Sequence, residues 1–431
     1  MTAYVATDAA VLPKRPHRIG AELQRLGLIY VWITFATSGV VFAEPAPHDA
    51  LLLGAMIALP LLGLVSFNRG LMLYLLLWVG ILVTSLVATT QAGVFGVPTK
   101  HVTITAYLAL SSFVIAGFVL DRPDTNVRFI MSAYVFAALV AAIPGLIGGL
   151  DLVPGMRDIF ATDHGRVHGT FKDPNVLGAF LVPPLLYMLN IVLHKGFGRS
   201  IFYVLAAPIL LLASLLAFSR GAWINLAAAL SVYGAITFVT LSWHRERLRL
   251  VIYVLLAGIL GVALLVAALT VPDVSRLMGE RASLQQYYDV GPEGRFGGQI
   301  KAIGVILSHP MGIGGLEFAR VFHKEDPHQI YLSMFLNAGW IGGTLYFALV
   351  LMTIWLGIRH IVRDRGGDGV NVVLLAAFIG MAFEGVVIDT DHWRHFFLIM
   401  AMIWGAALAP MAAWGRSGQS GLQAAPVGSG P

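Results

Sequence analysis

The chain has 431 residues, of which 58% are apolar and only 12% are charged. Soluble domains carry roughly 25% charged residues, so this composition excludes a soluble globular protein. Cysteine is absent, which excludes disulfides, thiolate metal sites and thiol catalysis. The net charge of +5 is modest, and we expect the lipid bilayer, and no nucleic acid, as a partner.

Long apolar runs recur along the chain, each sufficient to cross about 30 Å of hydrocarbon. The alternating segments of an outer-membrane barrel are absent, so the spans are predicted to be helices. We predict an all-α polytopic membrane protein with about 12 transmembrane helices. The predicted spans are 26–43, 50–67, 71–89, 102–120, 127–150, 176–194, 200–217, 222–241, 250–270, 331–358, 371–389 and 396–413.

The distribution of charge predicts the orientation of these spans. A cytoplasmic N-terminal tail (1–25) places 16 of the 28 basic residues inside, as the positive-inside rule favours. Two long connections within the membrane domain (26–413), at about 151–175 and 271–330, then lie on the outer side of the membrane. The remaining residues, 414–431, are predicted to form a disordered cytoplasmic tail. Alternatively, the first apolar segment is a cleaved signal peptide, which leaves the other spans unchanged.

A tight turn, Ser219-Arg220-Gly221, joins two predicted spans at the outer face. Ser219 is a natural N-cap for the helix that begins near Ala222. Arg220 then lies in the first turn, where the helix dipole disfavours a cation unless an anion shares the site. Free backbone N–H groups and a guanidinium together make a phosphate receptor. The alternative is an arginine that contacts lipid headgroups.

The long outer loop contains a second arginine in a similar position. Apolar residues recur at helical spacing over 294–307, which predicts an amphipathic helix on the membrane surface with Arg295 in its first turn. Further along, His328 precedes the tenth span, where an imidazole can accept a proton near neutral pH. The alternatives are an arginine that holds lipid phosphate and an ordinary interfacial histidine.

Two shorter segments add candidate substrate-binding residues. The segment 166–175 places Arg166, His168 and Lys172 just before a span. The turn 389–395 adds three more candidates, Asp391, His392 and Arg394. The acidic and histidine side chains of this turn suit a divalent metal, but the interleaved arginine favours a salt-bridged lid over the site.

One carboxylate, Glu384, is predicted to lie within the eleventh span. A carboxylate inside a membrane is a functional candidate by default. The structural alternative is an ion pair with an arginine of the helix bundle.

These segments, taken in order, resemble the O-antigen ligase and O-antigen polymerase superfamily of bacterial envelope glycosyltransferases. The resemblance is carried by an R-x-x-G-x-F-x-x-P-N pattern at 166–175, by S-R-G-A-W at 219–223, by Gly294-Arg295, by H-P-M-G-I-G at 309–314, by H-Q-I-Y-L at 328–332 and by A-G-W-I-G at 338–342. Two departures are Gln329, where many relatives have asparagine, and the 389–395 turn, which is typical of only some members.

The resemblance implies a GT-C-like, metal-independent transferase in the bacterial inner membrane, with no cofactor and a periplasmic active site. Such proteins move a glycan from a polyprenyl-diphosphate carrier to a glycan or lipid-linked acceptor. By motif, His328 is the catalytic residue, while Arg220 and Arg295 bind the diphosphate. Other polysaccharide-assembly proteins are further candidate partners.

Two other functions fit the same sequence. A transporter or flippase of polysaccharide or lipid-linked glycan would place ionisable residues at mid-membrane depth along a path, and Glu384 is the main candidate. A non-catalytic membrane component of a polysaccharide-assembly complex would need the outer-face residues only for contact with its partners.

Overall fold

The computed structural model describes residues 20–162, 164–241, 243–281, 291–363, 367 and 369–409. Within these ranges the regular structure is helical, apart from two isolated bridges, Val41–Phe171 and Ala161–Val167. The C-terminal tail predicted at 414–431 and most of the N-terminal tail predicted at 1–25 lie outside the described residues.

The helices are listed here in chain order with their bounds. They are α1 (Ala21–Ala36), α2 (Pro47–Leu61), α3 (Arg69–Thr89), α4 (Gly96–Asp121), α5 (Pro123–Gly149), α6 (Arg157–Phe160), α7 (Pro174–Phe180), α8 (Val182–Lys195), η1 (Gly198–Ser200), α9 (Ile201–Leu216), α10 (Arg220–Thr240), α11 (His244–Ala268), α12 (Pro272–Arg281), α13 (Arg295–Ser308), α14 (Glu317–Val321), α15 (Ile330–Arg363), α16 (Val370–Glu384) and α17 (Arg394–Ala407).

Eight helical segments among the described residues are long and apolar enough to cross a membrane: α3, α4, α5, α7 with α8, η1 with α9, α10, α11 and α15. The chain is therefore a multi-pass membrane protein. Each of the 12 predicted spans overlaps a helix, but α1, α2, α16 and α17 have only 16, 15, 15 and 14 residues. The count of 12 stays a prediction, because a 15-residue helix rises only about 22 Å.

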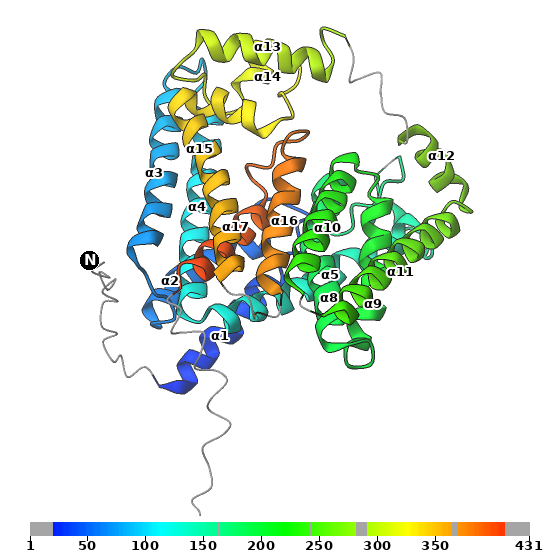
Figure 1. Cartoon of the computed structure of the whole chain (residues 1–431). Helices are drawn as coiled ribbons and strands as arrows, with labels where there is room; N and C mark the ends of the chain where they lie inside the picture. Colours follow the sequence, from blue (N-terminus) through cyan, green and yellow to red (C-terminus); the bar gives the residue numbers. More distant parts are fainter. Residues whose placement is uncertain are drawn as a thin grey trace, which may run out of the picture.

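The helices pack as pairs of neighbours that are distant in the sequence. The most extensive contacts join α10 to α16, α15 to α3 and α17 to α4, and Figure 1 shows α16 beside α10. Side chains of α4 and of α7 with α8 are mostly buried, whereas Leu250 and Ala268 are the only buried residues of α11. Exposure of so apolar a helix is expected where it faces lipid.

Helix α13 crosses one end of this bundle, over α3 and α15, and we call this end of the molecule the α13 end (Figure 1). The predicted helix is confirmed, and Arg295 is its first residue. Its small residues Gly298 and Ala302 are buried, while the large apolar side chains Phe296, Ile300 and Leu307 are exposed. An exposed apolar face of this kind is what a helix in a membrane surface presents to lipid.

A break in α15 holds the loop after α13 in place. Gly339 adopts φ 68° and ψ −172°, a conformation that is essentially confined to glycine. There the Trp340 N–H donates to the Pro310 carbonyl at 2.9 Å, and the Ile313 N–H donates to the Leu336 carbonyl at 2.7 Å. A Cβ on Gly339 would lie 2.6 Å from the Pro310 oxygen. The glycine therefore permits the close approach that docks this loop on α15.

Replacing Gly339 with alanine should destabilise the protein. The backbone conformation alone costs a side chain about 1–3 kcal/mol, and the contact with Pro310 adds to that. Thermal unfolding in detergent should show a lower midpoint. The matched control is Gly304→Ala on α13, where a Cβ meets open space and should be neutral or stabilise by up to about 1 kcal/mol. Equal midpoints for the two variants would contradict this role of Gly339.

Candidate functional site

His328 lies in the connection between α14 and α15, and it has a left-handed backbone with φ 49°. Its Nε2 is 3.7 Å from a Glu325 carboxylate oxygen, and its Nδ1 is 3.9 Å from Asp389. An Arg295 guanidinium nitrogen donates to the His328 carbonyl at 3.4 Å. The structure thus brings together two of the three residues that the sequence singled out, from α13 and from the segment before α15.

The surroundings of His328 favour its neutral form. Partial burial lowers the pKa of the imidazole, and the nearby positive charge of Arg295 lowers it further, against the opposing effects of Glu325, Asp326 and Asp173. The side chain is nevertheless 42% exposed. A neutral, accessible imidazole is able to accept a proton from a hydroxyl group.

Two carboxyl groups close to His328 have raised pKa values. Burial raises the pKa of Asp326, and burial followed by the negative charge of Asp391 raises the pKa of Asp389 to about 7. Ser333 donates to Asp389 at 2.6 Å, which ties the 389–395 turn to the first turn of α15. Asp389 therefore links His328 to this turn.

Arg220 is the first residue of α10, and Ser219 is the predicted N-cap. The Ser219 hydroxyl accepts from the Ala222 N–H at 3.2 Å, which confirms that prediction. A Cβ on Gly221 would lie 3.0 Å from Glu384. In turn, the Ile330 N–H donates to the carbonyl of Gly385, the next residue, at 2.9 Å. The end of α16 therefore connects the turn that carries Arg220 to the segment that carries His328.

Glu384 is the last residue of α16 and is completely buried. The Asn225 amide donates to one of its carboxylate oxygens at 2.8 Å, and the other oxygen has no hydrogen-bond partner among the residues that the structure describes. Its neighbours are the first turn of α10 and Gly385. Glu384 therefore lies at the end of a helix and beside the candidate site, rather than along the middle of a span.

The segment 166–175 is bound to the turn between α9 and α10. Arg166 donates to the Ala217 carbonyl at 3.0 Å and to Asn175 at 2.8 Å. Within the segment, a ring nitrogen of His168 lies 2.5 Å from the Phe171 carbonyl. These bonds hold Arg166 and His168 in place. They also fasten the segment to Ala217, which precedes Arg220 by three residues.

Lys172 and Arg394 share an acidic neighbour. Lys172 lies 3.8 Å from Glu44, and Arg394 lies 3.7 Å from the other oxygen of the same carboxylate. Arg394 also donates twice to Asp49, at 2.6 and 2.7 Å. The predicted salt bridge of the 389–395 turn therefore exists, and its acidic partners come from the start of α2 and the residues before it.

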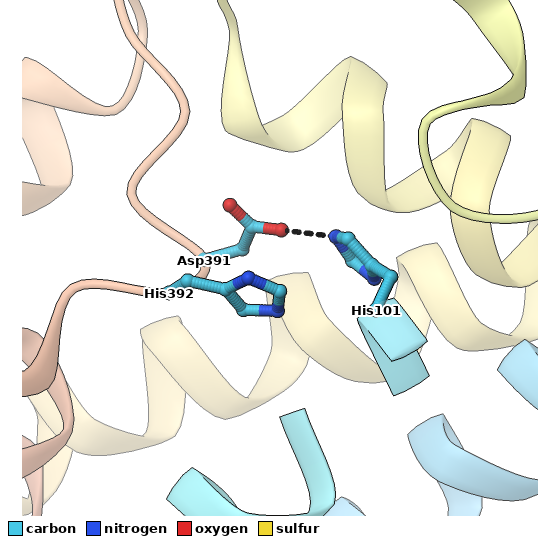
Figure 2. Close-up of side chains that lie close together, drawn as sticks. All are labelled: His101, Asp391 and His392. Atoms are coloured by element: carbon cyan, nitrogen blue, oxygen red, sulfur yellow. Dashed lines mark hydrogen bonds and ion pairs between the residues drawn. The ribbon is translucent and has the colours of Figure 1, made fainter. Parts of the chain in front are cut away.

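The other two candidates of the turn, Asp391 and His392, contact side chains of α4. A nitrogen of His101, on α4, is 2.8 Å from Asp391 (Figure 2). His392 Nε2 is 3.0 Å from the hydroxyl of Thr105, also on α4. His395 points elsewhere: it is buried against Phe180. Of the acidic and histidine side chains of this turn, Asp391 and His392 therefore lie close together, and His101 joins them among the residues that the structure describes.

A cavity of about 300 Å³ lies between α1, α2, α4, α7 and α17. Its lining is apolar over most of its surface, with Phe35, Leu108 and Phe180 among the contacts. Ionisable side chains also line it, among them Glu44, Lys172, Asp173, His392 and Arg394. His328, Arg220 and Arg295 do not line it, but Asp173 does, and the charge of Asp173 also acts on His328. The cavity and the His328 site are therefore neighbours.

No model of a known protein family matches the chain, and no curated protein is similar to its sequence. The site must therefore be judged on its own residues. Sequence reasoning missed His101, Asp49 and Asp173, which all contact or influence predicted site residues. A signal existed for His101, since an ionisable residue at the start of an apolar span is a functional candidate.

Proposed function

We propose that the chain is a membrane glycosyltransferase of the O-antigen ligase or polysaccharide polymerase kind. It transfers or polymerises a glycan from a polyprenyl-diphosphate carrier at the periplasmic face of a bacterial inner membrane. The observation that carries the proposal is the adjacency of His328 and Arg295, an imidazole held neutral beside a guanidinium. The ordered motifs of the O-antigen ligase superfamily support it independently.

The proposed reaction assigns a base and two cations. The acceptor hydroxyl gives its proton to the His328 imidazole while its oxygen bonds to the anomeric carbon of the donor glycan. The bond from that carbon to the diphosphate oxygen breaks, and polyprenyl diphosphate leaves with the electron pair. Arg295 and Arg220 stabilise the negative charge that develops on the leaving group, so this step needs no metal ion.

The start of α10 suits the diphosphate for a second reason. Helix N-termini present free N–H groups and a positive dipole to an anion, and Arg220 adds a formal charge there. The large exposed apolar side chains of α13 place Arg295 beside lipid. An amphiphilic carrier with a polyprenyl tail and a diphosphate head fits this combination.

Reconstitution into proteoliposomes tests the proposal. The purified full chain is supplied with a defined polyprenyl-diphosphate oligosaccharide, and both product formation and movement of the donor across the bilayer are measured. We expect longer glycan, or glycan joined to added acceptor, together with free polyprenyl diphosphate. Donor movement without any transfer would favour the transporter alternative and contradict the proposal.

The pH dependence of the transfer rate should follow the protonation of the His328 imidazole. Because its pKa is lowered below 6.5, the base is neutral at pH 7, and kcat/KM should fall only when the pH drops below 6.5 and the imidazole becomes protonated. Glu325 raises this pKa, so Glu325→Gln should move the acid limb of the profile to lower pH. Glu22→Gln on α1 is the control and should leave the limb unchanged. If the acid limb of the kcat/KM profile stays at the same pH in Glu325→Gln, His328 is excluded as the titrating base.

A further inference from the structure

Two histidines and one aspartate from distant parts of the chain meet at the α13 end. His101 lies on α4, and Asp391 and His392 lie on the connection between α16 and α17. One potential ligand atom from each lies within 4.8 Å of the other two. We propose that His101, Asp391 and His392 form a binding site for a zinc ion. Zinc binding is independent of the transferase activity proposed above.

The side chains converge on one point. Figure 2 shows the Asp391 carboxylate beside the His101 ring and next to the His392 ring, with one nitrogen of His392 on the side of its ring that faces Asp391. His101 Nε2 lies 2.8 Å from an Asp391 oxygen, and the two imidazole rings are 4.3 Å apart between centroids. His101 is 7% exposed and Asp391 16% exposed. The donor atoms are thus gathered and largely shielded from water, which is how protein metal sites are built.

The hydrogen bonds of Thr105 favour one tautomer of His392. The Thr105 hydroxyl donates its one hydrogen to the His101 carbonyl at 3.0 Å. With that bond made, the hydroxyl is an acceptor in its 3.0 Å contact with His392 Nε2, an arrangement that places the ring proton on Nε2. The lone pair of His392 is then on Nδ1. Second-shell bonds of this type orient the imidazoles of established metal sites, and here Thr105 leaves a ring nitrogen available as a ligand.

The neighbouring Arg394 does not oppose a cation at this site, because carboxylates outside the cluster neutralise its charge. Arg394 is bonded to Asp49 through two nitrogens and is also close to Glu44. The cluster itself is surrounded by negative groups, since Asp326 and Asp389 act electrostatically on His101. A divalent cation would offset this accumulation of carboxylates.

Zinc is the metal that this donor set fits best. It prefers imidazole nitrogen and carboxylate oxygen at about 2.0–2.2 Å, in a tetrahedron whose ligand atoms are about 3.3 Å apart. His101 and Asp391 need to separate by only about half an ångström from their hydrogen-bonded position. Magnesium and calcium prefer sites made entirely of oxygen. Bound zinc would tie the connection between α16 and α17 to α4.

Metal binding by the purified full chain tests this site. The protein in detergent is dialysed against EDTA, exchanged into zinc chloride, freed of unbound ion and assayed for zinc by mass spectrometry. We expect one zinc per chain, and an increase in the thermal unfolding midpoint on addition of zinc. Magnesium chloride at the same concentration should give neither result.

Three variants locate the ion. His101→Ala and His392→Ala should each weaken zinc binding at least tenfold. Asp391→Asn keeps the shape of the side chain and should also abolish the zinc-dependent rise in the unfolding midpoint, even where an alanine variant folds poorly. His164→Ala replaces an exposed histidine outside the cluster and should retain one zinc. A wild-type chain that binds no zinc, or zinc that persists in all three cluster variants, would overturn the proposal.

Discussion

Replacing His328 with alanine should lower kcat/KM for glycan transfer by a factor of about 10²–10⁴, the usual contribution of a general base. The imidazole lies beside Arg295 and is accessible, and its removal takes the proposed base from the site. Donor binding should change much less, because the base acts on the acceptor hydroxyl. The measurement is the rate of polyprenyl diphosphate release at varied donor and acceptor concentrations.

The matched control for this substitution is His164→Ala, which replaces an exposed histidine in another connection. It should retain wild-type kinetics. Both variants must elute as the wild type does from size exclusion in detergent, so that a loss of rate is a loss of chemistry. A His328→Ala protein with unchanged kcat/KM would remove the base from the proposed mechanism.

Removal of either arginine should have an effect of similar size. Arg295→Ala and Arg220→Ala each delete a cation that stabilises the departing diphosphate, and loss of one such donor lowers kcat by about 10²–10³. Arg295→Lys should restore only part of the rate, since lysine lacks the planar fork that binds two phosphate oxygens. The readout is kcat at saturating donor.

Lys301→Ala is the matched control for Arg295, because Lys301 is exposed on the same helix, α13. It removes a positive charge from the same surface without touching the segment of His328. We expect it to retain full kcat. An equal loss of rate in Lys301→Ala and Arg295→Ala would indicate a general attraction for anionic lipid, and not a specific diphosphate contact.

Local signals in the sequence predicted local structure well. Ser219 followed by an apolar run indicates a capped helix, and α10 begins there as expected. The helical spacing of Phe296, Ile300 and Leu307 predicted α13. The lengths of the apolar runs placed every predicted span on a helix. For the eleventh span, however, they predicted a helix end at residue 389, whereas α16 ends at Glu384, where the chain turns and packs on α10 and α15.

The contacts across the site depend on tertiary packing and could not be predicted. Arg394 pairs with Asp49, which lies 345 positions earlier in the chain. His101 meets Asp391 because α4 packs against α17. The residue types in the 389–395 turn suited a divalent metal, and the interleaved arginine favoured a salt-bridged lid, but neither indicated which distant residues would be the partners. Neighbouring residues of this turn instead contact different helices. Asp389 contacts α15, Asp391 and His392 contact α4, and Arg394 contacts α2.

Single-turnover transfer tests the central claim most directly. A labelled glycan on polyprenyl diphosphate is mixed with excess wild-type or His328→Ala protein, and both the transferred glycan and the released carrier are followed over time. We predict that the wild type releases one carrier for each glycan transferred, and that the variant does so at least 10² times more slowly while still binding the donor. A wild-type protein that binds the donor and transfers nothing, or equal rates for the two proteins, would contradict the account.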